Sequence, residues 1–175
     1  MIVGIDIETT GLDPTRDRIL EIAAIVVSND LTVIREKRER TIITDFDLLD
    51  VQQIDLCERM HRPTGLLDDV RHNGYHLADA EASIVDLVHS WRIYDEPTDH
   101  VIAMGTCVHF DLAFLRHWMP ALHVLFSHRT LDAKTPQLLW PDHPWPTFEG
   151  TQHRAMSDIL HSLAILREVR RFGPK

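Results

Sequence analysis

Apolar positions along the first quarter of the chain fall into short runs that favour β-strands. Two runs rich in Ile and Val lie at residues 2–7 and 19–27, and a more loosely alternating stretch follows at 31–44. The polar turn GLDPTRDR separates the first two runs. Because the connections are short, these three segments predict an antiparallel meander whose third strand lies at a polar edge.

Helical spacing dominates the chain after this meander. Over residues 79–94 apolar side chains recur at i, i+4, i+7, i+8 and i+11, which forms one stripe of a helix with Asp79 as its N-cap. The remaining predicted elements are strands at 100–104 and 130–132, helices at 110–118 and 154–171, and a Pro-rich loop at 141–150.

This order of elements predicts one α/β domain over residues 1–175. Its mixed sheet is expected to be antiparallel in the first three strands and parallel where helices intervene, with helices flanking it. The chain has 175 residues, of which 44% are hydrophobic and 26% charged, as is usual for a globular domain of this size. We find no internal repeat and no linker, so a single domain is expected.

Cysteine content and hydropathy indicate the cellular compartment of the protein. The chain has only two cysteines, Cys57 and Cys107, which argues against a disulfide scaffold and fits a reducing environment. No apolar run approaches the roughly 20 residues that span a bilayer. The first residues, MIVGIDIETTGL, lack the basic and long apolar regions of a signal peptide. We therefore expect a cytoplasmic protein with no membrane partner.

The net charge narrows the range of partners. With 27 acidic and 18 basic residues the formal charge is −9, which disfavours a protein that scans double-stranded DNA. A site that gathers carboxylates around divalent cations is acidic by construction and becomes less negative once it is loaded. Metal-dependent chemistry on a short anionic substrate therefore stays open.

Asp6 and Glu8 are the first candidates for such chemistry. Side chains two apart on a strand point the same way, so both carboxylates project from one face of an apolar strand. If they are buried, a Lys, an Arg or a metal must balance them; alternatively, the strand end frays into water. The turn from Thr9 to Leu12 follows directly, and its backbone amides can approach a ligand closely.

Further acids lie at predicted helix starts and strand ends. Asp111 starts the helix at 110–118 and Asp158 lies in the first turns of the last helix, where helix N-termini favour carboxylates in any case. Spacing alone does not choose between this pair and Asp99 or Asp132. His153, at the end of the Pro-rich loop, suits a general base, although with 12 histidines in the chain its closeness to Asp158 is unremarkable.

Together these parts resemble a known family. Four segments resemble the DEDDh group of 3′-to-5′ exonucleases in order and spacing, from residue 2 to about 167: IDIETTGL, DRILEIAAIV, HFDLAFL and HRAMSD. Within that group GLDPTRDRILEIA, DLCERMHRPTGL and LDAKT are similar to stretches of the oligoribonuclease family. The resemblance implies a ribonuclease H-like fold, a homodimer, and hydrolysis of very short single-stranded RNAs from the 3′ end to 5′-mononucleotides. It also implies two Mg²⁺ or Mn²⁺ ions per active site.

The resemblance assigns residue roles as well. The family's four metal-binding acids fall on Asp6, Glu8, Asp111 and Asp158, and its general base falls on His153. Hard oxygen ligands select Mg²⁺ or Mn²⁺ over zinc, so we interpret Cys57 and His61 as structural rather than as a zinc pair. The resemblance also implies substrate-binding positions. Thr9 lies in the turn and Leu12 is an apolar wedge against the bases. Arg129, with His61 and His128 of the partner subunit, surrounds a 5′ phosphate, and Cys107 and Lys134 lie beside them.

Departures from the family pattern keep a second hypothesis open. Leu56 and His128 stand where the oligoribonuclease family has Trp and Tyr, and Cys107 and Lys134 replace small hydroxyl residues. An exonuclease of the same fold that acts on single-stranded DNA or on longer RNA 3′ ends is therefore the alternative. A binding module without catalysis is a third hypothesis, which nothing favours because all five catalytic positions are filled. A dimer interface or the core would equally explain the apolar residues Trp118, Met119, Leu122, Leu125 and Phe126.

Overall fold

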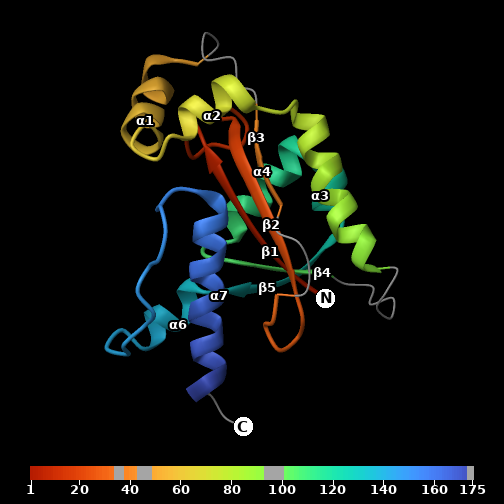
Figure 1. The fold of residues 1–175 in the computed structure, drawn as a ribbon, viewed down its shortest axis with the longest axis vertical. Helices are drawn as coiled ribbons and strands as arrows, with labels where there is room; N and C mark the ends of the chain where they lie inside the picture. Colours follow the sequence, from red (N-terminus) through yellow and green to blue (C-terminus); the bar gives the residue numbers. More distant parts are fainter. Residues whose placement is uncertain (34–37, 43–48, 93–100, 173–175) are drawn as a thin grey trace.

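Five strands form one mixed sheet in the order β3–β2–β1–β4–β5 (Figure 1). The computed structural model describes residues 1–33, 38–42, 49–92 and 101–172. β1 pairs antiparallel with β2 and β2 with β3, whereas β1–β4 and β4–β5 are parallel. The predicted mixed sheet with its third strand at an edge is thereby confirmed. The strands are β1 (Ile2–Thr9), β2 (Ile19–Val27), β3 (Arg38–Thr41), β4 (Val101–Gly105) and β5 (Phe126–Asp132).

Helices cover both faces of the sheet (Figure 1). On one face α7 buries Ile159 and Leu163 against β1, β2 and β4. On the other face α3 and α4 contribute Ile84 and Phe114 to the larger core cluster. The helices are α1 (Val51–His61), α2 (Leu66–Asn73), α3 (Leu77–Arg92), α4 (His109–Trp118), α5 (Pro120–His123), α6 (Lys134–Leu139) and α7 (Ala155–Phe172). None of the helices within the described ranges is long and apolar enough to cross a membrane.

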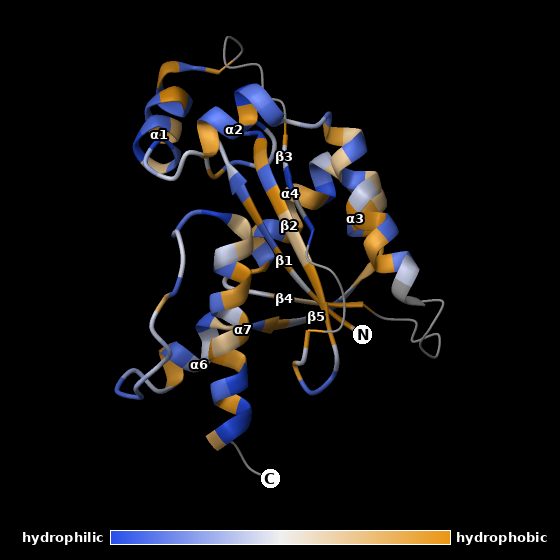
Figure 2. Ribbon diagram, viewed as in Figure 1, coloured by the Kyte–Doolittle hydropathy of each residue, from blue (hydrophilic) through white to orange (hydrophobic). Residues whose placement is uncertain are grey.

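The closeness of α7 to β1 depends on Gly4. A Cβ atom at this position would lie 2.8 Å from Ile159 Cγ2 and 2.8 Å from Met104 Cε, so any larger side chain would push the helix away. Figure 2 shows that β1 and β2 are apolar over most of their length and that β1 becomes polar toward its C-terminal end. The first turns of α7 therefore lie directly over the polar end of β1.

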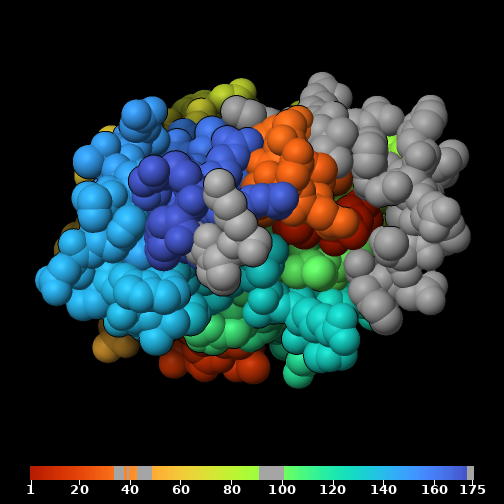
Figure 3. Space-filling model, turned by 90° about the horizontal axis from the view of Figure 1, so that it is seen from below, coloured from red at the N-terminus to blue at the C-terminus, as the bar shows by residue number. Residues whose placement is uncertain are grey.

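Contacts on two sides tie the C-terminal end of α7 to other parts of the chain. Arg167 Nε and Arg170 Nη1 donate to the carbonyls of Leu31 and Asn29 in the turn after β2, and Figure 3 shows this orange turn beside the blue helix. On the other side, the ring centroids of Phe172 and His143 are 4.5 Å apart. The Pro-rich loop at 141–150 is thus fixed along α7 rather than extending from it.

Some predicted boundaries move. The helix expected at 79–94 begins at Leu77, so Asp79 lies in its first turn and is not the N-cap. The strand expected at 130–132 begins earlier, at Phe126. The sequence did not indicate its first residues, because exposed residues at the sheet edge carry no apolar alternation. Residues 34–37 and 43–44 of the third strand, residues 93–94 of the helix, His100 and Asp99 lie outside the described residues.

Two of the five apolar residues weighed between core and dimer interface are core residues, since Met119 and Leu122 are fully buried. Trp118, Leu125 and Phe126 pack against the main cluster and keep part of their surface exposed.

Candidate active site

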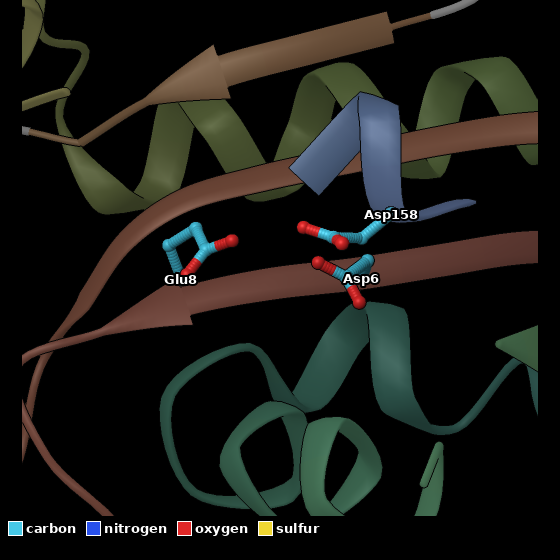
Figure 4. A group of neighbouring side chains, drawn as sticks. All are labelled: Asp6, Glu8 and Asp158. Carbon is cyan, nitrogen blue, oxygen red and sulfur yellow. The ribbon is translucent and has the colours of Figure 1, made fainter. Parts of the chain in front are cut away.

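Three carboxylates converge where the C-terminal end of β1 meets the start of α7. Asp6 and Glu8 project from the same face of β1, as their spacing predicts, and Asp158 points toward them from the first turns of α7 (Figure 4). One oxygen from each of the three lies within 4.8 Å of the others. Strand alternation supplies two of these groups, and the close packing of α7 supplies the third.

Asp111, the fourth predicted acid, approaches the same segment of β1 from α4. It sits in the first turn of α4, is 3% exposed, and its Oδ1 accepts a hydrogen bond from the Ile7 backbone N–H at 3.0 Å. It lies outside the group of three whose oxygens come within 4.8 Å. The structure thus places all four predicted acids around one segment of β1, with Asp111 bonded to its backbone.

The protonation of these acids reflects burial and mutual repulsion. Burial, followed by repulsion from Asp158, Glu21 and Asp111, raises the pKa of Glu8 to about 9. Burial likewise raises the pKa of Asp111 to about 8. The pKa of Asp6 is well above its usual value, mainly from burial and then from Asp111, and burial raises the pKa of Asp158. At Glu8, burial and repulsion thus outweigh the positive charge of the neighbouring Arg154.

A divalent cation fits this cluster. Carboxylate oxygens are the ligands that Mg²⁺ and Mn²⁺ prefer, and a bound cation would reverse the repulsion that raises these pKa values. The neighbouring cation, Arg154, lowers the pKa of Glu8 by less than burial and the surrounding carboxylates raise it. Its guanidinium bonds Glu21 at 2.8 Å and Asp69 at 2.9 Å. Of the two compensations considered from the sequence, a metal therefore fits better than an arginine.

Glu21 is a site residue that sequence reasoning missed. It lies directly opposite Glu8 on β2, is fully buried, and accepts hydrogen bonds from the Arg154 guanidinium and from the Ala155 backbone N–H at 2.8 Å. Glu21 thereby caps the N-terminus of α7 and holds the segment that carries His153. Its signal in the sequence is a single charge inside the apolar run ILEIAAIVV.

His153 sits at the mouth of the acidic site. It is exposed, has a φ of 59°, and lines a cavity of about 300 Å³ with Asp6, Glu8 and Asp158. The His153 charge and the backbone of His153 and Arg154 each lower the pKa of Asp158, but burial outweighs them and leaves it raised. The loop thus brings the imidazole beside the carboxylates, where a general base for an attacking water would be needed.

His61 lies beside the acidic residues of its own chain. Its ring is 1% exposed, Nε2 lies 3.0 Å from the Thr9 carbonyl oxygen, and Nδ1 lies 3.8 Å from Glu8 Oε2. Within one chain the ring therefore supports Glu8 and Thr9, and its role toward a partner subunit stays a prediction.

Other predicted residues lie around the site rather than in its cavity. Leu12 is 79% exposed at the turn after β1, and the Thr9 hydroxyl donates to the Gly11 carbonyl at 2.6 Å. The side chains of four further candidates are exposed on or next to β4 and β5, and none of them lines the acidic cavity: Cys107, His128, Arg129 and Lys134.

Two competing interpretations of polar residues are now resolved structurally. Asp132 accepts the backbone N–H groups of Val108 and Lys134, which explains it as a turn-stabilising acid. Cys57 is buried beside Leu20 and Leu66, and burial raises the pKa of its thiol to about 11. A thiol in this apolar setting is structural rather than a zinc ligand.

Comparison with known proteins identifies the family. The RNase T family model, described as exonuclease, matches residues 3–166. The chain belongs to this exonuclease family. Membership makes the protein a hydrolytic nuclease, and Asp6, Glu8 and Asp158 of this exonuclease are placed so that they could hold a metal ion.

Curated relatives of this exonuclease match it over almost its whole length. An oligoribonuclease of Halorhodospira halophila is 33% identical over 97% of this chain and 92% of its own. One of Chromobacterium violaceum is 30% identical over 97% of this chain and 93% of its own.

Solved structures similar to this exonuclease show the fold. E. coli exonuclease I in complex with single-stranded DNA superposes with a TM-score of 0.69 at 20% identity and covers 99% of this chain. Exonuclease I of Methylocaldum szegediense gives a TM-score of 0.66 at 21% identity. The chain spans 41% of each of these longer proteins, and the likeness confirms its ribonuclease H-like fold.

Proposed function

We propose that this exonuclease degrades short oligoribonucleotides from the 3′ end to 5′-mononucleotides, with Asp6, Glu8, Asp111 and Asp158 holding two Mg²⁺ or Mn²⁺ ions. The observation that carries the proposal is the approach of Asp6, Glu8 and Asp158 oxygens to within 4.8 Å of one another, with Asp111 on the adjoining backbone. The likeness to oligoribonucleases over nearly the full chain supports the substrate class.

The residues divide the chemistry between them. Ions bound by the four carboxylates would supply Lewis-acid activation of water and neutralise charge on the scissile phosphate. His153 accepts the proton of the attacking water, because its position on the exposed loop lets it face the cavity mouth. Glu21 and Arg154 keep that loop and the start of α7 in place.

The substrate end is proposed to lie across the exposed residues near β5. Leu12 would contact a base, while Arg129 and Lys134 attract a 5′ phosphate beside Cys107 and His128. A second subunit would close this side, so we expect a homodimer, and sedimentation equilibrium measures it directly. A monomer at assay concentration would contradict this part of the proposal and would leave the carboxylate chemistry intact.

The alternative substrate is single-stranded DNA or a longer RNA 3′ end. It is favoured by Leu56 and His128, where the oligoribonuclease family carries aromatic residues. Loss of an aromatic platform costs roughly 1–3 kcal/mol per stacked base. Such a loss weakens selection for the shortest substrates.

A length series tests the function and separates the two substrates. We expect 5′-mononucleotides to be released from RNAs of two to about twenty nucleotides with Mg²⁺ or Mn²⁺, at rates that fall steeply beyond two or three nucleotides. Asp158→Ala should abolish release, and Asp142→Ala, in the exposed loop, is the matched control. Equal turnover by Asp158→Ala and the native protein would reject the mechanism. A flat rate over length, or faster cleavage of DNA, would select the alternative.

A further inference from the structure

The acidic cavity has a second wall that the metal chemistry does not use. Besides the carboxylates, its lining includes Phe148, His161 and the side-chain amides of Gln137 and Gln152. This wall carries no charge at neutral pH apart from what His161 can acquire, and it lies within the same 300 Å³ as the group that would hold the scissile phosphate. A phosphate bound at the carboxylates therefore presents its attached nucleoside to a wall of rings and amides.

Phe148 and His161 form one aromatic surface from two distant segments. Their ring centroids are 4.9 Å apart at an interplanar angle of 47°. Phe148 belongs to the Pro-rich loop and His161 lies one turn beyond Asp158 on α7, so the pair bridges the loop to the helix. Both rings are half-buried, and each keeps part of its surface facing the cavity.

His161 is not explained by the stability of the fold. Its Nδ1 is buried and finds no hydrogen-bond partner within the described parts of the chain. A buried polar atom without a partner weakens folding, and an apolar residue at this helix position would avoid the cost. The ring is therefore better explained by what it offers to the cavity.

Phe148 and His161 also place aromatic rings in the acidic cavity, which the positions of Leu56 and His128 do not. Leu56 lines a different hollow with Thr10 and Gly11, and His128 faces the groove beside α4. Neither of these positions places a ring in the acidic cavity, whereas Phe148 and His161 do. Flat aromatic faces bind nucleobases of any sequence by stacking, and nearby amides can meet the polar edge of a base.

We propose that Phe148 and His161 form a stacking surface for the nucleoside attached to the scissile phosphate, and that they are substrate-binding residues of this site. The inference rests on the proposed function, because it takes the carboxylates as the phosphate position. Gln137 and Gln152 face the same space and contribute hydrogen bonds without selecting a particular base.

Binding of two small probes tests the surface without requiring turnover. Adenosine 5′-monophosphate and ribose 5-phosphate share the phosphate and the sugar and differ by the base. By calorimetry in the presence of Mn²⁺ we expect the native protein to bind the nucleotide about 5- to 100-fold more tightly. Phe148→Ala and His161→Ala should each reduce this ratio, and together bring it close to one.

Two further variants separate stacking from loop integrity. Phe148→Tyr keeps a ring and should restore the ratio. Phe172→Ala loosens the same loop at its contact with His143, outside the cavity, and should leave the ratio as it is. An unchanged ratio in the double variant, or no preference for the nucleotide in the native protein, would overturn the stacking surface.

The outcome is distinct from that of the length series. A protein that prefers the nucleotide through Phe148 and His161 but releases no mononucleotides from RNA would refute the proposed degradation of short oligoribonucleotides and keep the stacking surface. Hydrolysis of RNA by the native protein, together with an unchanged binding ratio in the double variant, would keep the proposed function and refute the stacking surface.

Discussion

Among individual residues, Asp111 differs most from its three acidic neighbours. Its Oδ1 accepts the Ile7 backbone N–H at 3.0 Å, and it is almost completely buried. The carboxylate therefore has two roles in the proposal, holding β1 in place and contributing charge to the metal site. Substitutions that change only the charge can separate these roles.

Asp111→Asn should separate them, because an amide oxygen can still accept from Ile7 while the charge is lost. The pKa of Asp111 is raised to about 8, so ionising it in the metal-free protein is unfavourable. We expect Asp111→Asn to raise the melting temperature in EDTA at pH 8.5. Hydrolysis should fall about 100-fold or more, since metal ions supply several kcal/mol of transition-state stabilisation. A lower melting temperature would show that the charge itself stabilises the fold.

His153→Ala tests the proposed base. General-base catalysis contributes roughly 10²- to 10⁴-fold. The variant should lose about 100-fold or more while it still binds Mn²⁺ in calorimetry. His72→Ala, exposed on α2, is the matched control; an unchanged rate in His153→Ala would remove this residue from the mechanism.

At the scale of elements, the site depends on how α7 is held against the sheet. Gly4 permits the close approach, and Glu21 on β2 caps the helix through Ala155 and binds Arg154. Asp158 lies in the first turns of this helix, and His153 lies two residues before the helix begins. Both metal binding and base placement thus depend on one buried ion pair.

Glu21→Gln tests this dependence. Breaking a buried ion pair costs about 3 kcal/mol here, at the low end because Asp69 remains a partner of Arg154. For a domain of this size that corresponds to a fall of about 6–12 °C in melting temperature. We also expect hydrolysis to fall more than Mn²⁺ affinity, because the loop with His153 is released first. Asp69→Asn, which removes the more exposed partner, should have a much smaller effect; equal effects would place the support elsewhere.

For the whole molecule, the buried carboxylates link folding to pH. Their pKa values are raised in the folded protein, to about 9 for Glu8 and about 8 for Asp111, so the folded state retains protons that the unfolded chain releases. Stability from these groups is therefore complete below about pH 4 and is lost as the pH rises toward 9.

Thermal unfolding with and without metal tests this linkage. In EDTA the melting temperature should fall between pH 5 and pH 8.5. Saturating Mn²⁺ should recover about 5–10 °C at the higher pH, because ligand at about 100 times its Kd adds about 2.7 kcal/mol. Glu8→Gln should flatten the fall in EDTA. A melting temperature in EDTA that increases over this pH range would contradict the raised pKa values.

Local patterns in the sequence are sufficient for much of this protein. Apolar runs and helical spacing predict the mixed sheet and its helices, since both depend on the periodicity of neighbouring residues. Alternation on β1 places Asp6 and Glu8 on one face for the same reason. The family motifs then identify Asp111, Asp158 and His153 as their companions, and the structure places all of them around one end of β1.

Contacts between distant segments could be identified only from the tertiary structure. The burial of His61 against Thr9, the pairing of Glu21 with Arg154 and the meeting of Phe148 with His161 join residues 52, 133 and 13 positions apart. Periodicity says which way a side chain points from its own element, but not which other element it meets. That is set by the packing of α7 and of the loop at 141–150 against the sheet, a property of the folded chain as a whole.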